Sequence, residues 1–156
     1  TINKRRQMNL SAHVTIAEFE RSDVATNFGI ENKMDSFQIE RAKALCENVF
    51  EPIRKHVGAP IRINSGYRSP AVNKRAGGAK TSQHCALNGA AMDLDLHDRA
   101  LFEWIIANIE FDQVIYEFGN DSKALWFHLS YNEGRNRRQA LRAIKKAGKT
   151  VYIPFV

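Results

Sequence analysis

The sequence has no long hydrophobic run and no internal repeat, and it contains only two cysteines. No apolar stretch approaches the roughly 20 residues that a membrane-spanning helix requires, so we expect none. The basic start has no apolar core of the kind found in secretory signals, so nothing in it directs export through the general pathway. Cys46 and Cys85 are too few for a disulfide scaffold and fit a reducing compartment. We expect a flexible basic arm over residues 1–11 and one domain over residues 12–156.

What the chain does contain is an ordinary globular composition with an excess of positive charge. Its 156 residues are 44% hydrophobic and 26% charged, enough for a hydrophobic core. The formal net charge of +6 suits an acidic partner such as nucleic acid, an anionic membrane surface or an anionic cell-wall polymer. Much of the excess lies in residues 134–149, "GRNRRQALRAIKKAGK", which we expect to be a basic helix. That helix presents either an ordinary solvated face or an anion-binding patch.

The first third of the chain has helix signals. A capping box at Thr15 and Glu18 predicts a short helix, and a second short helix is expected to end at Gly29. A longer helix starts at Asp35, where Gln38 completes a second capping box, and Pro52 is expected to kink or divide it. Its apolar residues recur at steps of three and four and form one stripe: Ile39, Ala42, Cys46, Val49, Ile53 and Val57.

The remainder of the chain alternates strand patterns with turn signals. The expected strands are 61–64, 90–96, 111–118, 125–131 and 150–155, with a helix after Asp98 and a long polar loop over 65–84. Loops of that length in a small domain are usually functional or disordered. The expected class is α+β: a single domain with a small, mostly antiparallel sheet flanked by helices.

Three side chains in this part of the chain suggest a metal site on the sheet. A carboxylate within an apolar strand, such as Asp93 in "AAMDLDL", is costly unless something binds it. Two histidines and one carboxylate are typical of catalytic zinc sites, which keep the fourth position for water. His84 and His128 supply the two imidazoles of such a set. The alternatives are that His128 is an ordinary strand histidine, and that Cys85 is a ligand or a nucleophile.

A base for such a site is suggested by the register of the expected hairpin. Directly opposed residues on antiparallel strands point to the same face. With a two- or four-residue loop, Glu117 is opposite Trp126 and becomes a diagonal neighbour of His128, roughly 7–8 Å away. Glu117 is therefore the expected general base, the alternative being an ordinary solvent-facing residue. Gln113 lies on the same face and is a candidate to orient substrate, although plain surface polarity explains it nearly as well.

Three motifs, taken in order, resemble the zinc D-Ala-D-Ala carboxypeptidase family. They are "INSGYRSPAVNKRAGGAKTSQH", "GAAMDLD" and "WFHLSY", and the resemblance covers roughly residues 12–131. Relatives of that family include the L-alanyl-D-glutamate endopeptidases of phage lysis and the vancomycin-resistance dipeptidases. The resemblance implies Zn2+ on His84, Asp93 and His128 and substrate-binding roles for Arg68 and Ser82. Arg68 is also an expected catalytic residue, because with zinc it would stabilise the charge that develops during hydrolysis. The alternative for Arg68 is a salt bridge between loop and sheet.

The chain departs from the family pattern at two places. Four residues, 85–88, separate the zinc histidine from the glycine, where most relatives have two, so we expect the extra residues to bulge outward. Many relatives also place an acidic base three residues before the last histidine, and that position is Leu125 here. Either Glu117 takes over this role or hydrolysis is impaired.

The function implied by the resemblance is a zinc metallopeptidase that hydrolyses peptidoglycan stem peptides containing D-amino acids. The absence of a signal and the basic charge fit a phage-type endolysin or a virion component, in the host cytoplasm or the particle, that acts on the cell wall and dwells on anionic wall polymers. The alternative is a virion or cell-wall-binding module that keeps the fold without turnover. Nucleic-acid binding ranks last, because no aromatic residues are interleaved with the basic ones. The sequence does not distinguish an endopeptidase from a carboxypeptidase.

Overall fold

The computed structural model describes residues 4, 5 and 7–156, which form one α+β domain. The helical elements are α1 (Ile16–Glu20), α2 (Asp23–Phe28), α3 (Ser36–Leu45), the π-helical turn η1 (Cys46–Phe50), α4 (Glu51–Val57), α5 (Pro70–Arg75), the 3-10 turn η2 (Gln83–Cys85) and α6 (Arg99–Asn108). The strands are β1 (Asn9–Ser11), β2 (Val14–Thr15), β3 (Ile63–Ser65), β4 (Ala90–Leu94), β5 (Gln113–Glu117), β6 (Trp126–Tyr131), β7 (Gln139–Lys146) and β8 (Lys149–Pro154). None of the described helices has both the length and the apolar character needed to cross a membrane.

The main sheet has six strands in the order β3-β4-β6-β5-β7-β8. All neighbouring pairs are antiparallel except β5 with β7. The mostly antiparallel sheet expected from the sequence is therefore confirmed. So is the register of the β5–β6 hairpin, in which Glu117 is opposite Trp126 and Ile115 is opposite His128. Because side chains alternate along each strand, this register decides which of them reach the site.

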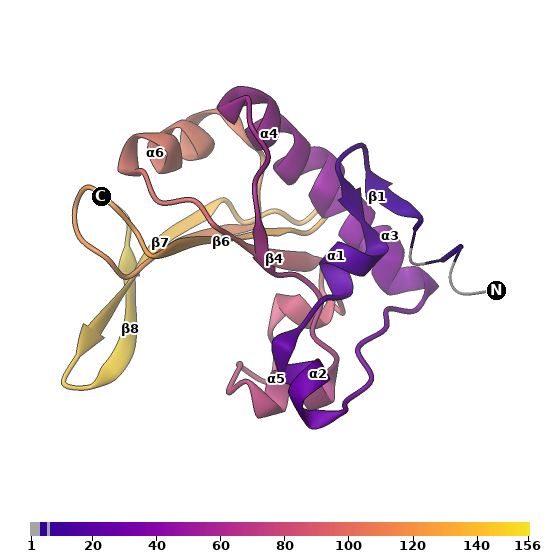
Figure 1. Cartoon of the computed structure of the whole chain (residues 1–156). Helices are drawn as coiled ribbons and strands as arrows, with labels where there is room; N and C mark the ends of the chain where they lie inside the picture. Colours follow the sequence, from indigo (N-terminus) through magenta and orange to yellow (C-terminus); the bar gives the residue numbers. More distant parts are fainter. Residues whose placement is uncertain (1–3, 6) are drawn as a thin grey trace.

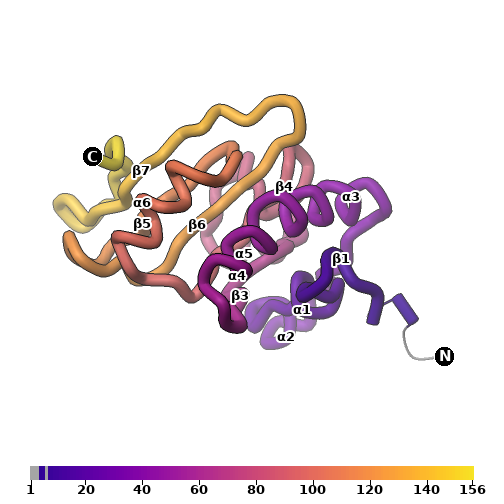
Figure 2. The backbone as a smooth tube through the Cα atoms, turned by 90° about the horizontal axis from the view of Figure 1, so that it is seen from above, coloured from indigo at the N-terminus to yellow at the C-terminus, as the bar shows by residue number. Residues whose placement is uncertain are grey.

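The two faces of this sheet have different surroundings. One face carries Met92, Leu94, Phe127 and Leu129, which belong to a buried core shared with apolar residues of α3, η1, α4 and α6. Figure 1 shows helices α4 and α6 above the sheet and the two short helices α2 and α5 below it. Figure 2 shows α3, α4 and α6 over the strands. The opposite face carries Asp93 and its partners, so the site lies on the side of the sheet away from these helices.

The long helix predicted from Asp35 is confirmed, and it changes hydrogen bonding just before Pro52. Its capping box is present, with Asp35 accepting from the Gln38 N–H. The Glu51 N–H donates five residues back, to the Cys46 carbonyl, in the π-helical turn η1. Pro52 then falls in the first turn of α4, where a missing N–H costs least.

The basic helix predicted over residues 134–149 is wrong, because β7 occupies residues 139–146. β7 pairs in parallel with β5 and antiparallel with β8, and these long-range hydrogen bonds override the local helix propensity of an Ala-, Arg- and Lys-rich stretch. Ala147 and Gly148 both have positive φ and form the two-residue turn to β8. The final edge strand predicted over residues 150–155 is confirmed as β8.

Part of the expected N-terminal arm is packed against the domain. Residues 1–3 and 6 lie outside the described residues, but β1 pairs with β2 and its Leu10 is buried in the core. The guanidinium of Arg5 makes two hydrogen bonds of 2.9 Å to the carboxylate of Glu20. The expected boundary between arm and domain at residue 12 is therefore too late, because the sequence segment that supplies Leu10 belongs to the core.

An aromatic cluster joins α6 to the sheet, and it should contribute strongly to stability. The ring of Phe102 contacts those of Tyr116, Phe127 and Phe155, with centroid separations of 5.5, 5.0 and 4.7 Å.

We expect Phe102→Ala to lower the free energy of unfolding by about 3–5 kcal/mol, measured by denaturant titration. The matched change Phe37→Ala, at a ring that is 72% exposed, should cost less than about 1 kcal/mol. Equal losses for the two variants would contradict this assignment of the core.

Candidate metal centre

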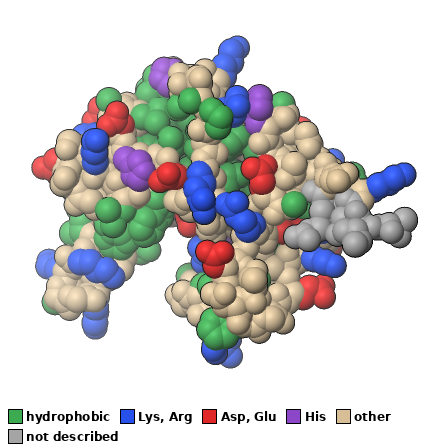
Figure 3. Space-filling view, in the orientation of Figure 1, with side chains coloured by type: hydrophobic (Ala, Val, Ile, Leu, Met, Phe, Trp, Pro, Cys, Tyr) green, Lys and Arg blue, Asp and Glu red, His purple; other side chains and the backbone are tan. Residues whose placement is uncertain are grey.

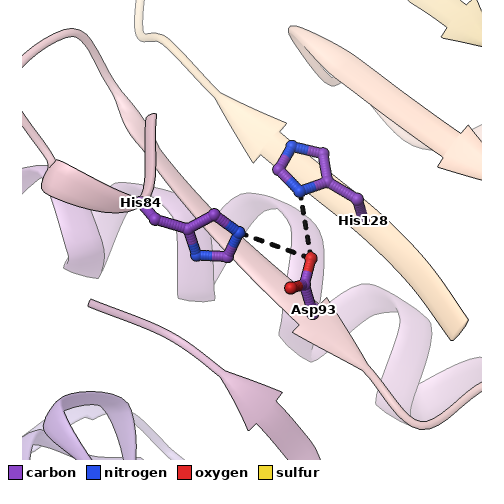
Figure 4. Close-up of side chains that lie close together, drawn as sticks. All are labelled: His84, Asp93 and His128. Atoms are coloured by element: carbon purple, nitrogen blue, oxygen red, sulfur yellow. Dashed lines mark hydrogen bonds and ion pairs between the residues drawn. The ribbon is translucent and has the colours of Figure 1, made fainter. Parts of the chain in front are cut away.

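His84, Asp93 and His128 converge on one point although they come from three separate segments. Asp93 on β4 and His128 on β6 are directly opposed, so their side chains leave the sheet on the same face. His84 lies in η2, which Ser82 caps by accepting a hydrogen bond from the His84 N–H. Figure 4 shows both imidazoles turned toward the carboxylate of Asp93. The three positions predicted for metal ligands are thus brought together.

The distances within this group suit a shared cation. Asp93 Oδ1 lies 3.0 Å from His128 Nδ1 and 3.4 Å from His84 Nε2. One ligand atom from each residue lies within 4.8 Å of the other two. His84 is 3% exposed, and Asp93 and His128 are partly buried. The group is therefore compact and largely shielded from water.

The hydrogen bonding of His84 leaves its inner nitrogen without a proton to donate when the ring is neutral. His84 Nδ1 lies 2.7 Å from the Gly66 carbonyl, which can only accept, so Nδ1 carries the proton. Nε2 of the neutral ring then presents a lone pair toward Asp93 Oδ1, so a positive charge between the two atoms, a proton or a metal ion, is favourable. A backbone carbonyl on the outer nitrogen is the usual support of a metal-bound imidazole.

Gly66 is held where this bond needs it by close packing against α1. A Cβ atom on Gly66 would collide with the backbone carbonyl and the ring of Phe19. The Tyr67 N–H donates to that same Phe19 carbonyl over 2.7 Å. The glycine of the "SGYRSP" motif is thus needed for the backbone to approach α1, and this approach places the carbonyl that orients His84.

Asp93 is ionised in this setting. Burial opposes its ionisation, but the neighbouring His84 and His128 outweigh burial and hold its pKa well below the usual range. Nη2 of Arg68 lies 3.6 Å from the second carboxylate oxygen, Oδ2. A carboxylate with one oxygen facing two imidazoles and the other facing a guanidinium is oriented to give Oδ1 to a cation.

Glu117 lies beside this group on the same face of the sheet, as the hairpin register predicted. It is opposite Trp126 on β6, two residues from His128, and only 8% exposed. Burial, with a smaller contribution from the charge of Asp93, raises its pKa to about 7, and His128 acts in the opposite direction. A buried carboxyl that takes up and releases a proton near neutral pH has the property required of a general base or acid.

Arg68 is fixed from three sides. Its Nε donates to Ser65 Oγ and its Nη1 to Asn73 Oδ1, each over 3.2 Å, and its Nη2 faces Asp93. Its backbone N–H donates to the His84 carbonyl over 2.9 Å. The ion pair between loop and sheet is thus present. The substrate-binding role predicted for Arg68 stays a prediction, compatible with a side chain that remains partly exposed.

The side chains of Ser82 and Gln113 have partners within the protein. Ser82 Oγ serves η2, and Gln113 Nε2 donates to Gln139 Oε1 on β7 over 2.7 Å. The structure therefore gives Ser82 a part in placing His84. The substrate-binding roles predicted for both residues stay predictions.

The remaining sequence candidates lie apart from the group. Cys85 is a buried free thiol and is not among the converging residues. Leu125, at the family's usual base position, is 56% exposed. Of the four residues between His84 and Gly89, Leu87 and Asn88 are exposed, as expected of an outward bulge, whereas Cys85 and Ala86 are buried.

The other three histidines of the chain lie in unrelated surroundings. His13 contacts Glu51, His56 stacks on Trp104, and His97 contacts Asp95.

Sequence reasoning missed a polar clamp that holds the His84 segment. Asp112, 2% exposed, accepts from Arg137 Nε over 2.9 Å and Arg137 Nη2 over 3.0 Å. It also accepts from Gln83 Nε2 over 2.7 Å, next to His84. No local pattern marks these three residues as partners, because they are separated by at least 25 positions. Arg137 thus belongs to a structural ion pair, within the stretch whose composition predicts a solvated or anion-binding helix.

The raised pKa of Glu117 makes the stability of the metal-free protein depend on pH. Below an ordinary carboxyl pKa of 4.5, Glu117 is neutral in the folded and unfolded states alike. Between 4.5 and about 7 the unfolded state loses this proton first, so stability falls as pH rises. We expect the free energy of unfolding of Glu117→Gln, minus that of wild type, to increase over this window and then level off. A difference that does not change with pH, measured by denaturant titration with chelator present, would refute the burial argument.

The comparisons with known proteins agree with this geometry. A family model described as Peptidase M15 matches residues 12–130, which is more than half of the chain. A search of curated proteins finds no significant match. The matched span contains all three converging residues, Arg68 and Glu117, and it ends before β7. The chain belongs to the M15 peptidase family.

Proposed function

We propose that this protein is a zinc-dependent peptidase that hydrolyses peptidoglycan stem peptides at bonds involving D-amino acids. The observation that carries the proposal is the convergence of His84, Asp93 and His128, with Glu117 beside them on one sheet face, in a member of a peptidase family. The carboxypeptidase and endolysin types share this machinery. They differ in how far the cleft extends past the scissile bond.

The residues present fit Zn2+. Two imidazoles and one carboxylate leave a position for water or substrate, and the lone pair of neutral His84 Nε2 faces Asp93 Oδ1, as two ligands of one cation would. When bound, zinc supplies a Lewis acid that polarises the peptide carbonyl and acidifies water. His84, Asp93 and His128 would hold it, and the Gly66 carbonyl would keep His84 in the tautomer that binds.

The side chains around the ligands supply the proton transfer and the charge stabilisation. Glu117, with its pKa near 7, takes a proton from the attacking water and delivers it to the leaving amine. Arg68 holds Asp93 in place and offers N–H groups toward a substrate carbonyl or carboxylate. The burial that raises the Glu117 pKa also keeps bulk water away from the reacting atoms.

The setting of the reaction is also part of the proposal. The net charge of +6 favours retention on anionic wall polymers close to the peptide substrate. An endolysin or virion component of a phage, acting on the wall from the host cytoplasm or from the particle, fits this charge. Nucleic-acid binding is not part of the proposal.

A second candidate function is a wall-binding module without turnover. It is favoured by one observation, Leu125 at the position where many relatives carry their acidic base. The buried Glu117 on the His128 face argues against it. The two candidates differ in a direct assay: the module binds purified peptidoglycan without releasing new amino or carboxyl termini.

The metal ligands can be tested with neighbouring aspartates. Asp93→Asn should weaken zinc binding at least about 100-fold, measured by calorimetry, because a charged ligand is lost. Release of peptide termini from peptidoglycan should fall to background. Asp95→Asn is the control, since Asp95 is exposed and pairs with His97 instead. Zinc affinity that is unchanged in Asp93→Asn, or lost equally in both variants, would contradict the ligand assignment.

If Glu117 transfers the proton without binding the metal, its removal should lower activity and leave zinc affinity unchanged. Glu117→Gln should lower kcat by about 100-fold or more while zinc affinity stays within about threefold of wild type. The exposed Glu133→Gln serves as the control. A Glu117→Gln protein that cleaves peptidoglycan at the wild-type rate would show that another group transfers the proton.

A further inference from the structure

The β7–β8 hairpin extends the face of the sheet on which the site lies. Across β6, β5, β7 and β8, one row of directly aligned residues runs from Trp126 through Glu117 and Ala143 to Tyr152. Aligned residues on neighbouring strands share a face, so all four side chains lie on the side of Asp93 and His128. Tyr152 is thus in line with Glu117, two strands further out.

The small side chain between these two residues leaves room for the tyrosine ring. Ala143 is buried and ends at its Cβ atom, so nothing of its own rises between Glu117 and Tyr152. Two strand spacings separate the two backbones by about 10 Å. Burial of the ring, and then the charges of Glu117 and Asp93, raise the pKa of Tyr152, which is consistent with its place on their side of the sheet. The ring is nevertheless 54% exposed and available to a ligand.

A fixed ammonium lies next to Tyr152 on the same face. Lys145 is two residues beyond Ala143 on β7, and its Nζ donates to Thr150 Oγ1 over 2.9 Å. The same Nζ lies 5.3 Å from the ring centroid of Phe118, directly after Glu117 in the chain. These contacts hold the ammonium on this face of the hairpin, separated by one residue pair from the Ala143–Tyr152 pair.

The charge and shape of this region fit an acidic peptide. After Glu133 the chain has no Asp or Glu, so no carboxylate of the hairpin neutralises Lys145. Figure 3 shows Lys and Arg on the hairpin, at lower left, and a hollow between the hairpin and the helices α2 and α5. The hairpin lies outside the span matched by the family model, which ends at residue 130.

We propose that Tyr152 and Lys145 form a substrate-binding subsite that holds a carboxylate-bearing segment of the peptide beside the scissile bond. This inference rests on the proposed peptidase function. The Tyr152 ring packs against the extended peptide and its hydroxyl donates a hydrogen bond, while Lys145 pairs with a free carboxylate. Stem peptides suit such a subsite because they carry free carboxylates along and at the end of the chain.

The test uses the full, zinc-loaded protein and a synthetic stem peptide, in a free-acid form and in a form with its carboxylates amidated. For the free acid, Tyr152→Ala should raise KM about tenfold with kcat within about twofold. Lys145→Gln should raise KM about tenfold for the free acid and less than twofold for the amide. The matched controls are Ile153→Ala and Lys146→Gln, which lie next to these residues on the opposite face. Zinc content should be the same in all variants.

The outcomes separate this inference from the function beneath it. A wild type that neither cleaves nor binds the peptide would overturn both. A wild type that cleaves it, with KM unchanged in Tyr152→Ala and Lys145→Gln, would overturn the subsite alone. Lys145→Gln that weakens retention on an anionic wall polymer while leaving KM unchanged would assign the ammonium to the polymer instead, and would likewise overturn the subsite.

Discussion

The site depends on a single ionised carboxylate on the face of the sheet that lies away from the core helices. Asp93 faces His128 because β4 and β6 pair in one register, and a one-residue slip would send it into the apolar core on the other side. His84 meets it only because the Gly66 carbonyl fixes the outer nitrogen of the imidazole. The cost of burying Asp93 is offset by two imidazoles and a guanidinium. Two imidazoles and a carboxylate that converge in this way are arranged as the ligands of one metal ion.

The architecture separates stability from chemistry by assigning each to one face of the same sheet. The helical face carries the aromatic and aliphatic core, including the Phe102 cluster. The other face carries Asp93, His128, Glu117 and, further out, the β7–β8 hairpin. Asp112 connects the His84 segment to the start of β7, because its carboxylate accepts hydrogen bonds from both Gln83 and Arg137. The C-terminal strands therefore belong to the fold as well as to the face that carries the site.

Much of this could be predicted from the sequence, because the signals were local or followed from strand parity. Capping boxes marked α1 and α3, and the short loop between β5 and β6 sufficed to place Glu117 on the His128 face. The failures came where distant contacts decide. Residues 139–146 have helix-forming composition but pair with β5, and Leu10 is buried by a small sheet that no local pattern announces. The clamp of Arg137 on Asp112 and the alignment of Tyr152 with Glu117 depend on that same unforeseen pairing.

X-ray absorption at the zinc edge of the zinc-loaded protein tests the central claim most directly. Two imidazoles and one carboxylate with an open position predict four N/O scatterers near 2.0–2.1 Å, with the multiple scattering of two histidine rings and no sulfur. In His128→Ala the signal of one ring should disappear. A sulfur scatterer near 2.3 Å would place Cys85 in the site and contradict the account, as would a spectrum that His128→Ala leaves unchanged.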